Sequence, residues 1–537
     1  MLYNRKEKQF INIENFHKLD YRNYNVYYSG LIYLAQGIKA GKPSIDIIIQ
    51  QYEKGEISFR DIYGIYVILI ENKEDKSIYM FSDNSGMTTS FYTEQFISDN
   101  FTEIARTMKN PKLYKKMICE YLTLSRGYYL ETFMEEVQML EASCYYEVQE
   151  EQLMKHSKKN GYLGDRSKLA DIPSFFADMA KSLSGLKVVS ALTGGYDSRM
   201  VVASLWKKLE FDLFISGNNL KSREIQLSKR AADSIQKELK ILSPDMKMIE
   251  KEKIIEQTFE NSGGRACTNS SGLYRVDYFQ KELQRQGYEV LLTGDAGDMY
   301  KDLWYKQEYP FYHKKSTNTR LFYATRMEPA NNAVFLGNDL LECYRNQRKN
   351  IIRELEKRKY GQAVKSYESY GYRIAWEKGA FSHSLGKGMV TYSPLQELEL
   401  VKYSFLQPIH MKRFNRLQRK IITERSRNLA KVPTTNGTNA SLDAFSICKD
   451  SWIESVGQVK RLVRGVRRKL GDREKTMAKV MLEDDADLRE LSLGRQAVKY
   501  CQRVGYIKPG LAIRDIPIAL LYKIIYIYQL ETAINRE

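Results

Sequence analysis

The sequence has little histidine and cysteine, the residues that most often bind transition metals. Its 537 residues include 5 histidines and 6 cysteines. The cysteines are scattered without CxxC or Cys/His spacing, and no two histidines have the spacing of metal ligands. Isolated thiols are typical of a reducing compartment. We therefore expect no zinc site and a cytoplasmic protein.

The sequence also lacks the long apolar runs that enter membranes. It begins without the apolar segment of a signal peptide, and no run reaches the roughly 20 apolar residues of a spanning helix. The longest candidate, residues 516–530, is short and is interrupted by Lys523. We therefore expect a buried helix there, and neither a signal peptide nor a transmembrane segment.

Proline is scarce, at 11 residues, whereas hydrophobic residues make up 43% of the chain. This composition is that of a folded protein rather than a disordered one. A chain of this length also exceeds what one hydrophobic core supports. We therefore expect two or more folded domains.

Basic residues outnumber acidic ones by 84 to 66, which gives a net charge of +18. This excess favours anionic partners such as nucleotides, nucleic acid or an acidic membrane surface. Residues 459–470 add a helical pattern with one apolar face and otherwise basic residues. Such a helix can bind an acidic peptide, a membrane or nucleic acid, although packing of the apolar face on the core is commoner. Charge alone does not choose among these partners.

The first part of the chain has the composition of β-strands, rich in Tyr, Ile and Val and separated by turn residues. We predict strands at 25–28, 62–70, 77–82 and 144–148. Residues 155–161 are polar and basic without periodicity, which predicts a surface linker. We therefore expect one domain over residues 1–155 and a second over 165–537.

In the second part, predicted strands alternate with predicted helices. The strands are expected at 186–192, 211–216 and 289–293, and the helices at 198–209, 223–239 and 274–286. Such alternation predicts a parallel sheet with its ligand at the carboxyl ends of the strands. From about residue 317 onward the pattern is mostly helical.

The segment 192–198 connects a predicted strand to a predicted helix and contains two adjacent glycines. These let the backbone turn tightly, so that N–H groups and the helix N-terminus converge on a point that suits a phosphate. The hydroxyl groups of Thr193 and Ser198 can add hydrogen-bond donors. A carboxylate such as Asp197 would repel a phosphate, which implies that Mg²⁺ lies between the two. The alternative is an ordinary strand-to-helix turn capped by Asp and Ser. The residues predicted to bind ATP and its pyrophosphate are Leu192, Thr193, Gly194, Gly195, Asp197, Ser198, Ser216 and Gly294.

A second segment, 293–298, again follows an apolar strand and contains two carboxylates three residues apart. In a parallel sheet both segments would open on the same edge. We therefore predict that Asp197 and Asp298 share Mg²⁺ bound to pyrophosphate, with Asp295 nearer the reacting carbonyl as a catalytic residue. The alternative for this segment is a Gly/Asp surface turn.

These motifs resemble those of the asparagine synthetase B family, in which a class II glutamine amidotransferase domain precedes an ATP-pyrophosphatase synthetase domain. Residues 193–198 resemble its Ser-Gly-Gly-x-Asp-Ser loop, and 293–298 its Ser-Gly-Glu-Gly-Ser-Asp segment. Residues 393–397 resemble Val-Pro-Phe-Leu-Asp, and 28–33 resemble Tyr-Asn-Gly-Glu-Ile-Tyr. Residues 429–437 are similar to a late lysine-and-glycine segment, which would make Lys431 the catalytic lysine.

The resemblance implies an α/β fold class. The N-terminal part would be an α+β amidotransferase-like (Ntn-type) sandwich. The remainder would be an α/β parallel-sheet ATP-pyrophosphatase (HUP/PP-loop) domain with a helical C-terminal part. Its cofactors would be ATP and Mg²⁺.

Several positions depart from the family pattern. The amidotransferase nucleophile is an N-terminal cysteine, but position 2 is Leu2, and Ser29 and Leu31 replace the Asn and Glu that would hold glutamine. We infer that this domain cannot hydrolyse glutamine and serves as a scaffold or as a docking surface for a partner protein. Val390 and Tyr392 replace a charged Glu-x-Arg pair, which argues against aspartate as substrate. The chain resembles divergent members such as β-lactam synthetases and lasso-peptide macrolactam cyclases.

We therefore expect an ATP-dependent amide-forming ligase that adenylates a carboxylate, in a small molecule or a peptide, for attack by ammonia or an amine. Two alternatives stay open: a PP-loop enzyme that modifies nucleic acid, and a non-catalytic scaffold. The degenerate front domain and the lack of paired cysteines for sulfur transfer count against a nucleic-acid substrate. Two retained carboxylates count against a scaffold.

Overall fold

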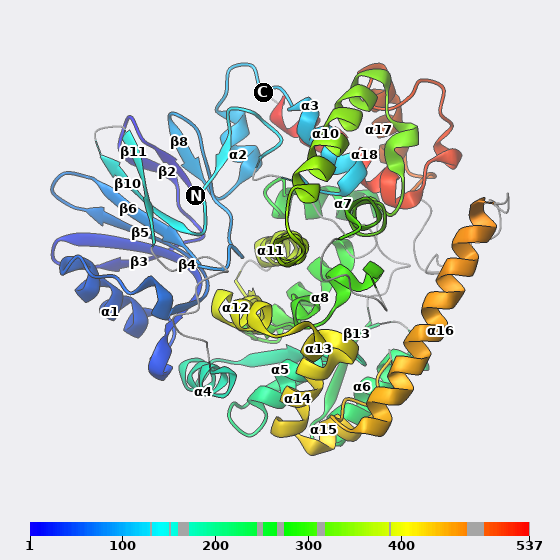
Figure 1. Cartoon of the computed structure of the whole chain (residues 1–537). Coiled ribbons are helices and arrows are strands. Elements are labelled where there is room, and N and C mark those ends of the chain that lie inside the picture. The colour runs from blue at the N-terminus through cyan, green and yellow to red at the C-terminus, as the bar shows by residue number, and fades with distance from the viewer. Residues whose placement is uncertain are drawn as a thin grey trace.

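Strand-forming residues build two antiparallel sheets in the N-terminal part, and a parallel sheet follows later in the chain (Figure 1). The protein is thus a mixed α/β protein, as the sequence predicts. This structure is a computed structural model. It describes residues 1–128, 131–149, 152–158, 171–217, 219–243, 251–265, 273–308, 317–385, 388–435, 437–469 and 488–535.

The larger antiparallel sheet has six strands in the order β11-β10-β6-β5-β4-β3. Central β5 is buried over nearly its whole length, which explains its continuous run of apolar residues. β4 and β5 approach closely at Gly64, where a Cβ atom would lie 2.1 Å from the Leu31 carbonyl oxygen. The strands are β3 (His17–Asp20), β4 (Tyr24–Leu34), β5 (Ile62–Asn72), β6 (Ile78–Ser82), β10 (Cys144–Gln149) and β11 (Gln152–Ser157).

The smaller antiparallel sheet has the order β2-β1-β8-β7-β9. Its strands are β1 (Leu2–Asn4), β2 (Gln9–Asn12), β7 (Phe91–Tyr92), β8 (Phe96–Ser98) and β9 (Gln138–Met139). Tyr3 and Ile97 of this sheet share a buried apolar cluster with Leu69 and Met80 of the larger one. The opposite face of the larger sheet is covered by α1 (Lys42–Glu53), through Ile45 and neighbouring isoleucines.

The parallel sheet has five strands in the order β14-β13-β12-β15-β16, and every pairing in it is parallel. Successive residues of β12 alternate between two cores: Val188 packs with α4 and α5, and Val189 packs with α8. The strands are β12 (Val188–Ala191), β13 (Asp212–Ser216), β14 (Leu239–Leu242), β15 (Val290–Leu292) and β16 (Val390–Tyr392). The flanking helices are α4 (Ile172–Leu183), α5 (Asp197–Leu205), α6 (Arg223–Asp233), α7 (Lys251–Asn261) and α8 (Leu273–Arg285).

Two local predictions are wrong. The helix expected over 223–239 ends at Asp233. A turn follows, and edge strand β14, whose side chains are all half-buried, begins at Leu239. Strand β16 is a short exception to the mostly helical pattern after residue 317, and it pairs with β15. The predicted linker begins inside β11, where residues 155–157 pair with β10. β11 is an edge strand with polar side chains, so its composition resembles that of a loop. From residue 159 on, the predicted linker lies outside the described residues.

The C-terminal third is mostly helical, as predicted. Its helices are α9 (Thr319–Phe322), α10 (Asn338–Glu356), α11 (Tyr360–Leu385), α12 (Leu398–Leu406), α13 (Ile409–Lys412), α14 (Arg416–Arg425), α15 (Arg427–Lys431), α16 (Ala444–Lys469), α17 (Ser492–Arg503) and α18 (Ile518–Ile534). The buried helix predicted over 516–530 is confirmed as α18. Across the described ranges, no helix is long and apolar enough to cross a membrane.

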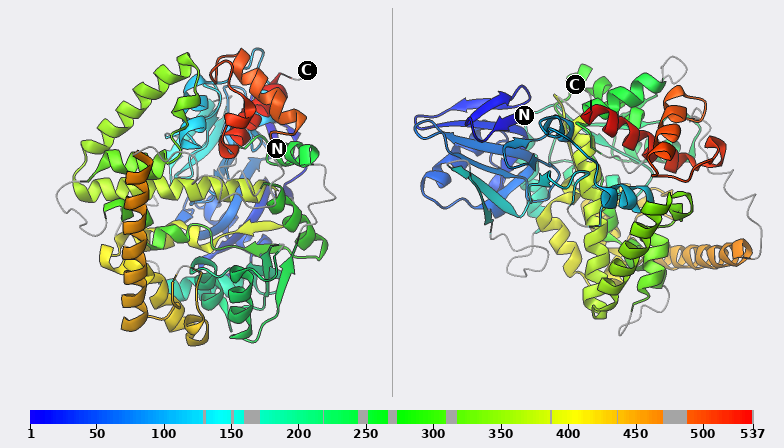
Figure 2. Two further views of the ribbon diagram at one scale, coloured as in Figure 1. Left: turned by 90° about the vertical axis from the view of Figure 1, so that its right-hand side faces the viewer. Right: turned by 90° about the horizontal axis from the view of Figure 1, so that it is seen from above.

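Two helices from the N-terminal part of the chain pack against helices of the C-terminal part. α2 (Phe101–Arg106) and α3 (Lys115–Leu124) pack with α10, α17 and α18 in one apolar core. In contrast, α16 projects from the body of the molecule (Figure 2). The basic segment predicted at 459–470 falls on the far part of this helix, where the side chains lie outside the described residues.

Candidate functional site

A cavity of about 390 Å³ opens at the carboxyl edge of the parallel sheet. One wall is the loop after β12, which contributes residues 195–197, and a second is the segment after β15, from Asp298 to Lys306. The remaining wall comes from Phe414, Asn415 and the first half of α16. The cavity therefore lies where the sequence places the ligand of such a sheet.

The loop after β12 is held by its own hydroxyl groups and by a segment from late in the chain. The Thr193 N–H donates to Ser198 Oγ at 2.9 Å, and the two hydroxyls lie 2.9 Å apart. The Thr435 N–H donates to the Gly194 carbonyl at 3.0 Å. A Cβ atom on Gly194 would lie 2.6 Å from Thr435 Cγ2. Glycine is thus needed at 194 because residue 435 packs directly on the loop.

The loop after β15 lies against the loop after β12, because β12 and β15 are adjacent parallel strands. A Cβ atom on Gly294 would lie 2.4 Å from the Ser198 amide nitrogen. A Cβ atom on Gly297 would lie 2.2 Å from Asp197 Cγ. Both glycines are required for this approach. The structure therefore brings the two predicted loops together.

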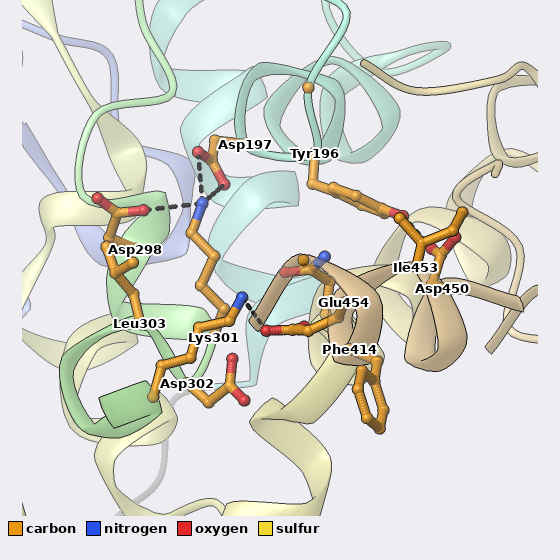
Figure 3. Close-up of a pocket in the computed structure, with 14 residues that line it drawn as sticks. Tyr196, Asp197, Asp298, Lys301, Asp302, Leu303, Phe414, Asp450, Ile453 and Glu454 are labelled. Carbon is orange, nitrogen blue, oxygen red and sulfur yellow. Dashed lines mark hydrogen bonds and ion pairs between the residues drawn. The ribbon is translucent and has the colours of Figure 1, made fainter. Parts of the chain in front are cut away.

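Asp197 and Asp298 contact the same cation, the ammonium group of Lys301 (Figure 3). Its Nζ lies 3.2 and 3.3 Å from the two carboxylate oxygens of Asp197 and 2.8 Å from Asp298 Oδ1. Burial opposes the charge of Lys301, but the two carboxylates outweigh it and raise the pKa of Lys301. Gln418 of α14 also donates to Asp197 Oδ1, at 2.6 Å, and so fixes that carboxylate.

Asp295 does not line the cavity with these carboxylates. Thr293 Oγ1 donates to its Oδ2 at 2.9 Å, and Lys378 of α11 forms an ion pair with its Oδ1. Burial alone would raise the pKa of Asp295, but the Lys378 ammonium and the Thr293 hydroxyl outweigh burial and lower it. The carboxylate is therefore held in its charged form by a lysine that the sequence did not single out.

The other predicted residues have separate positions. Leu192 is fully buried, and Ser216 lies at the exposed end of β13. Lys431 ends α15, is exposed and does not line the cavity. Its segment is nonetheless anchored to α5, because buried Arg199 donates to the carbonyls of Val432, at 2.6 Å, and of two neighbouring residues.

Several lining residues were not predicted from the sequence. Asp450 of α16 forms a buried ion pair with Arg419, and both contact the Tyr196 hydroxyl. Glu454 of the same helix pairs with Lys306. Lys301 carried one available signal, its position three residues after Asp298. The acids of α16 carried none, since they lie more than 150 residues away in the sequence.

The donor set fits a magnesium ion that is shared with phosphates. Mg²⁺ usually binds one or two protein carboxylates and completes its shell with phosphate and water oxygens. Asp197 and Asp298 supply two carboxylates directed at one point. Within the described ranges, no cluster of three or more His, Cys, Asp or Glu side chains could hold a metal by itself.

A second cavity, of about 530 Å³, lies between the antiparallel sheets and the later part of the chain. It is lined by Met1, Ser29, Arg265 and His383, among others. Burial beside Arg265 lowers the pKa of His383 to about 4, so this side chain is neutral. No cysteine is found among the described residues that line this cavity.

The fold and site define a mixed α/β protein with two touching, glycine-bearing loops at the carboxyl edge of a parallel sheet. Comparison with known proteins adds no closer assignment: no protein-family model matches the chain, and no curated protein matches its sequence significantly.

Proposed function

We propose that the protein is an ATP-dependent carbon–nitrogen ligase that activates a carboxylate as an acyl-adenylate. A carboxylate oxygen would attack the α-phosphorus of ATP, and pyrophosphate would leave. A nitrogen nucleophile would then attack the acyl carbon, and AMP would leave with formation of the amide bond. The acid would be a small molecule or a peptide.

One observation carries this proposal. Two aspartates that follow separate strands contact the same ammonium group, that of Lys301, in a cavity at the carboxyl edge of a parallel sheet. Carboxylates at a phosphate site need such a cation between them and the phosphate oxygens. If the two loops were only structural turns, their aspartates would not need to face each other.

The residues around the cavity have definite parts in this proposal. The backbone of the Gly194-Gly195 loop and the N-terminus of α5 would bind the pyrophosphate oxygens. Asp197 and Asp298 would hold Mg²⁺, which neutralises charge on the leaving diphosphate when it is bound. Asp295, kept charged by Lys378, would lie toward the reacting carbonyl. The family resemblance would make Lys431 the catalytic lysine, whereas the contact with Asp295 favours Lys378 for that role.

The front of the molecule would be the degenerate amidotransferase-like domain, of the Ntn type, over residues 1–155. Residues 165–537 would form the PP-loop synthetase domain. The nitrogen would come from ammonia or an amine rather than from glutamine, and the front domain would act as a scaffold or dock a partner protein.

Pyrophosphate release tests the proposal. The purified protein is incubated with ATP, Mg²⁺ and a panel of carboxylic acids and peptides, and AMP and pyrophosphate are quantified. A ligase releases both only when its acid is present. Release that requires RNA instead, or binding of ATP without turnover for any acid, would overturn the proposal.

A further inference from the structure

Lys301 occupies the position where Asp197 and Asp298 converge (Figure 3). Its ammonium group contacts three carboxylate oxygens at 2.8 to 3.3 Å. Lys301 follows the short 3-10 helix Gly297–Tyr300 and adopts an extended backbone, so it is tethered three residues from one of the aspartates it contacts. Lys306, the other lysine of the cavity wall, is paired with Glu454.

The ammonium group and a divalent ion need the same oxygens. Two carboxylates brought this close repel each other unless a cation lies between them. Lys301 supplies that cation within the chain itself, as a point charge with three N–H donors on a flexible stem. A metal that binds between the two aspartates through these oxygens therefore has to displace Lys301.

We propose that Lys301 is a resident cation that competes with Mg²⁺ for Asp197 and Asp298. In the nucleotide-free protein it holds the two loops together and keeps divalent ions weakly bound. Phosphate oxygens offer the displaced ammonium group new acceptors, so that metal and nucleotide bind together rather than in sequence. This inference rests on the proposed function, since it takes the two aspartates as the metal ligands.

The test measures Mn²⁺ binding by electron paramagnetic resonance, with the full-length protein and without nucleotide. Lys301→Met removes the competing charge and leaves both carboxylates, so Mn²⁺ should bind at least about tenfold more tightly than to the wild type. Lys306→Met removes a lysine from the same cavity wall and should leave Mn²⁺ affinity at the wild-type value. Lys301→Arg keeps the charge and should also bind Mn²⁺ weakly.

A second substitution locates the metal. Adding Asp197→Asn to the Lys301→Met protein should abolish the gain in Mn²⁺ affinity. Thermal melting checks that each variant is folded, and Lys301→Gln replaces Lys301→Met if the latter does not fold.

An affinity of the Lys301→Met protein within twofold of the wild type, or weaker, would overturn the competition. So would equal gains in the Lys301→Met and Lys306→Met proteins. If acid-dependent pyrophosphate release by the wild type persists beside such a result, only the role of Lys301 is lost. If no variant binds Mn²⁺ at millimolar concentration, the competition fails, and the metal assignment of the two aspartates fails with it.

Discussion

The two aspartates at the cavity differ in how firmly they are held. Asp197 accepts hydrogen bonds from both Lys301 and Gln418, whereas Asp298 forms an ion pair with Lys301. Asp298 is also the more exposed, at 45% against 32% for the Asp197 side chain. A metal shared with phosphates would therefore have one fixed protein ligand and one that can adjust.

Replacing either aspartate by asparagine keeps its size and removes its charge. Under the proposed function, Asp197→Asn and Asp298→Asn should each reduce acid-dependent pyrophosphate release by about 100-fold or more, the usual effect of losing one element of transition-state charge stabilisation. Asp339→Asn, on the exposed face of α10, is the matched control and should retain activity. Near-normal turnover in either cavity variant would contradict the metal assignment.

Under the proposed function, two lysines are candidates for the cation at the reacting carbonyl. The family resemblance assigns that role to Lys431, which is exposed and outside the cavity wall, whereas Lys378 forms an ion pair with Asp295. Because charge stabilisation requires close contact, we expect Lys378→Met to lower kcat by about tenfold or more. Lys431→Met should change it less. Steady-state kinetics of both variants decides this, and the reverse order would restore the assignment to Lys431.

At the scale of the elements, the contact between the loops after β12 and β15 has almost no free space. A Cβ atom on Gly297 would lie within 2.4 Å of three atoms of Asp197. Gly297→Ala should therefore push the two loops apart and abolish acid-dependent pyrophosphate release. Gly457→Ala, in α16 on the same cavity wall, meets no atom within 4 Å and should be tolerated or stabilise its helix by up to about 1 kcal/mol. Activity assays and thermal melting of the two proteins make the comparison, and an active Gly297→Ala protein would show that the loops separate at no cost.

The sequence predicted the elements that bear strong local signals. The strands that became β5, β12, β13 and β15 have apolar runs, and the glycine loops after β12 and β15 mark two strand ends. Because parallel strands end at one edge, the meeting of Asp197 and Asp298 could also be predicted.

Other features depend on tertiary contacts, which leave little trace in the local sequence. β14 and β16 have only four and three residues and are defined by pairing with β13 and β15. Lys378 reaches Asp295 across 83 positions of sequence. Gln418 contacts Asp197 across 221 positions of sequence. The spacing of apolar residues along the chain does not predict such long-range contacts.

At the scale of the whole molecule, the larger antiparallel sheet is linked to the parallel sheet by a buried polar cluster. The hydroxyls of Tyr33 in β4 and Tyr392 in β16 share a hydrogen bond of 2.9 Å. Glu397 accepts hydrogen bonds from Tyr392 at 2.7 Å and from the Gly64 N–H of β5 at 2.8 Å. Arg60 adds an ion pair with Glu399 at 3.0 Å. These contacts join the front of the molecule to the sheet that bears the proposed site.

This cluster should make stability depend on pH. Glu397 is 2% exposed, and its burial raises the pKa of the carboxyl group to about 8. Between the unfolded pKa and that value, the folded protein holds a proton that the unfolded chain has lost, so the free energy of unfolding falls as pH rises. The stabilisation is complete at or below about pH 4.5 and is lost by about pH 8, with a full range of the order of 5 kcal/mol.

Glu397→Gln keeps a neutral side chain of the same shape and should remove this dependence. Urea unfolding at pH 5.5 and pH 8 should show the variant gaining stability relative to the wild type at the higher pH. Glu424→Gln, on the exposed side of α14, controls for loss of a carboxylate at the surface. A difference between wild type and Glu397→Gln that does not change with pH would mean that Glu397 is ionised in the folded protein.

Under the proposed function, the nitrogen of the amide bond would not come from glutamine. The second cavity lies between the antiparallel sheets and the later part of the chain, and Met1 and Ser29 are among the residues that line it. Leu2, which follows Met1, is buried in β1. Glutamine hydrolysis of this class needs a thiolate that attacks the side-chain amide, and the described lining offers none. We therefore expect no glutamate above background when the protein is incubated with glutamine, ATP and its acid substrate.

Under the proposed function, ammonium or an amine should support amide formation in the same conditions, because the nucleophile would then reach the acyl-adenylate without hydrolysis at the front of the molecule. A glutamate-specific assay run beside the pyrophosphate assay distinguishes the cases. Leu2→Cys is an informative companion, since it adds a thiol in β1 but not the glutamine-holding residues replaced by Ser29 and Leu31, and so should stay inactive with glutamine. Glutamate formed by the wild-type protein in proportion to pyrophosphate would show that the cavity hydrolyses glutamine by another nucleophile.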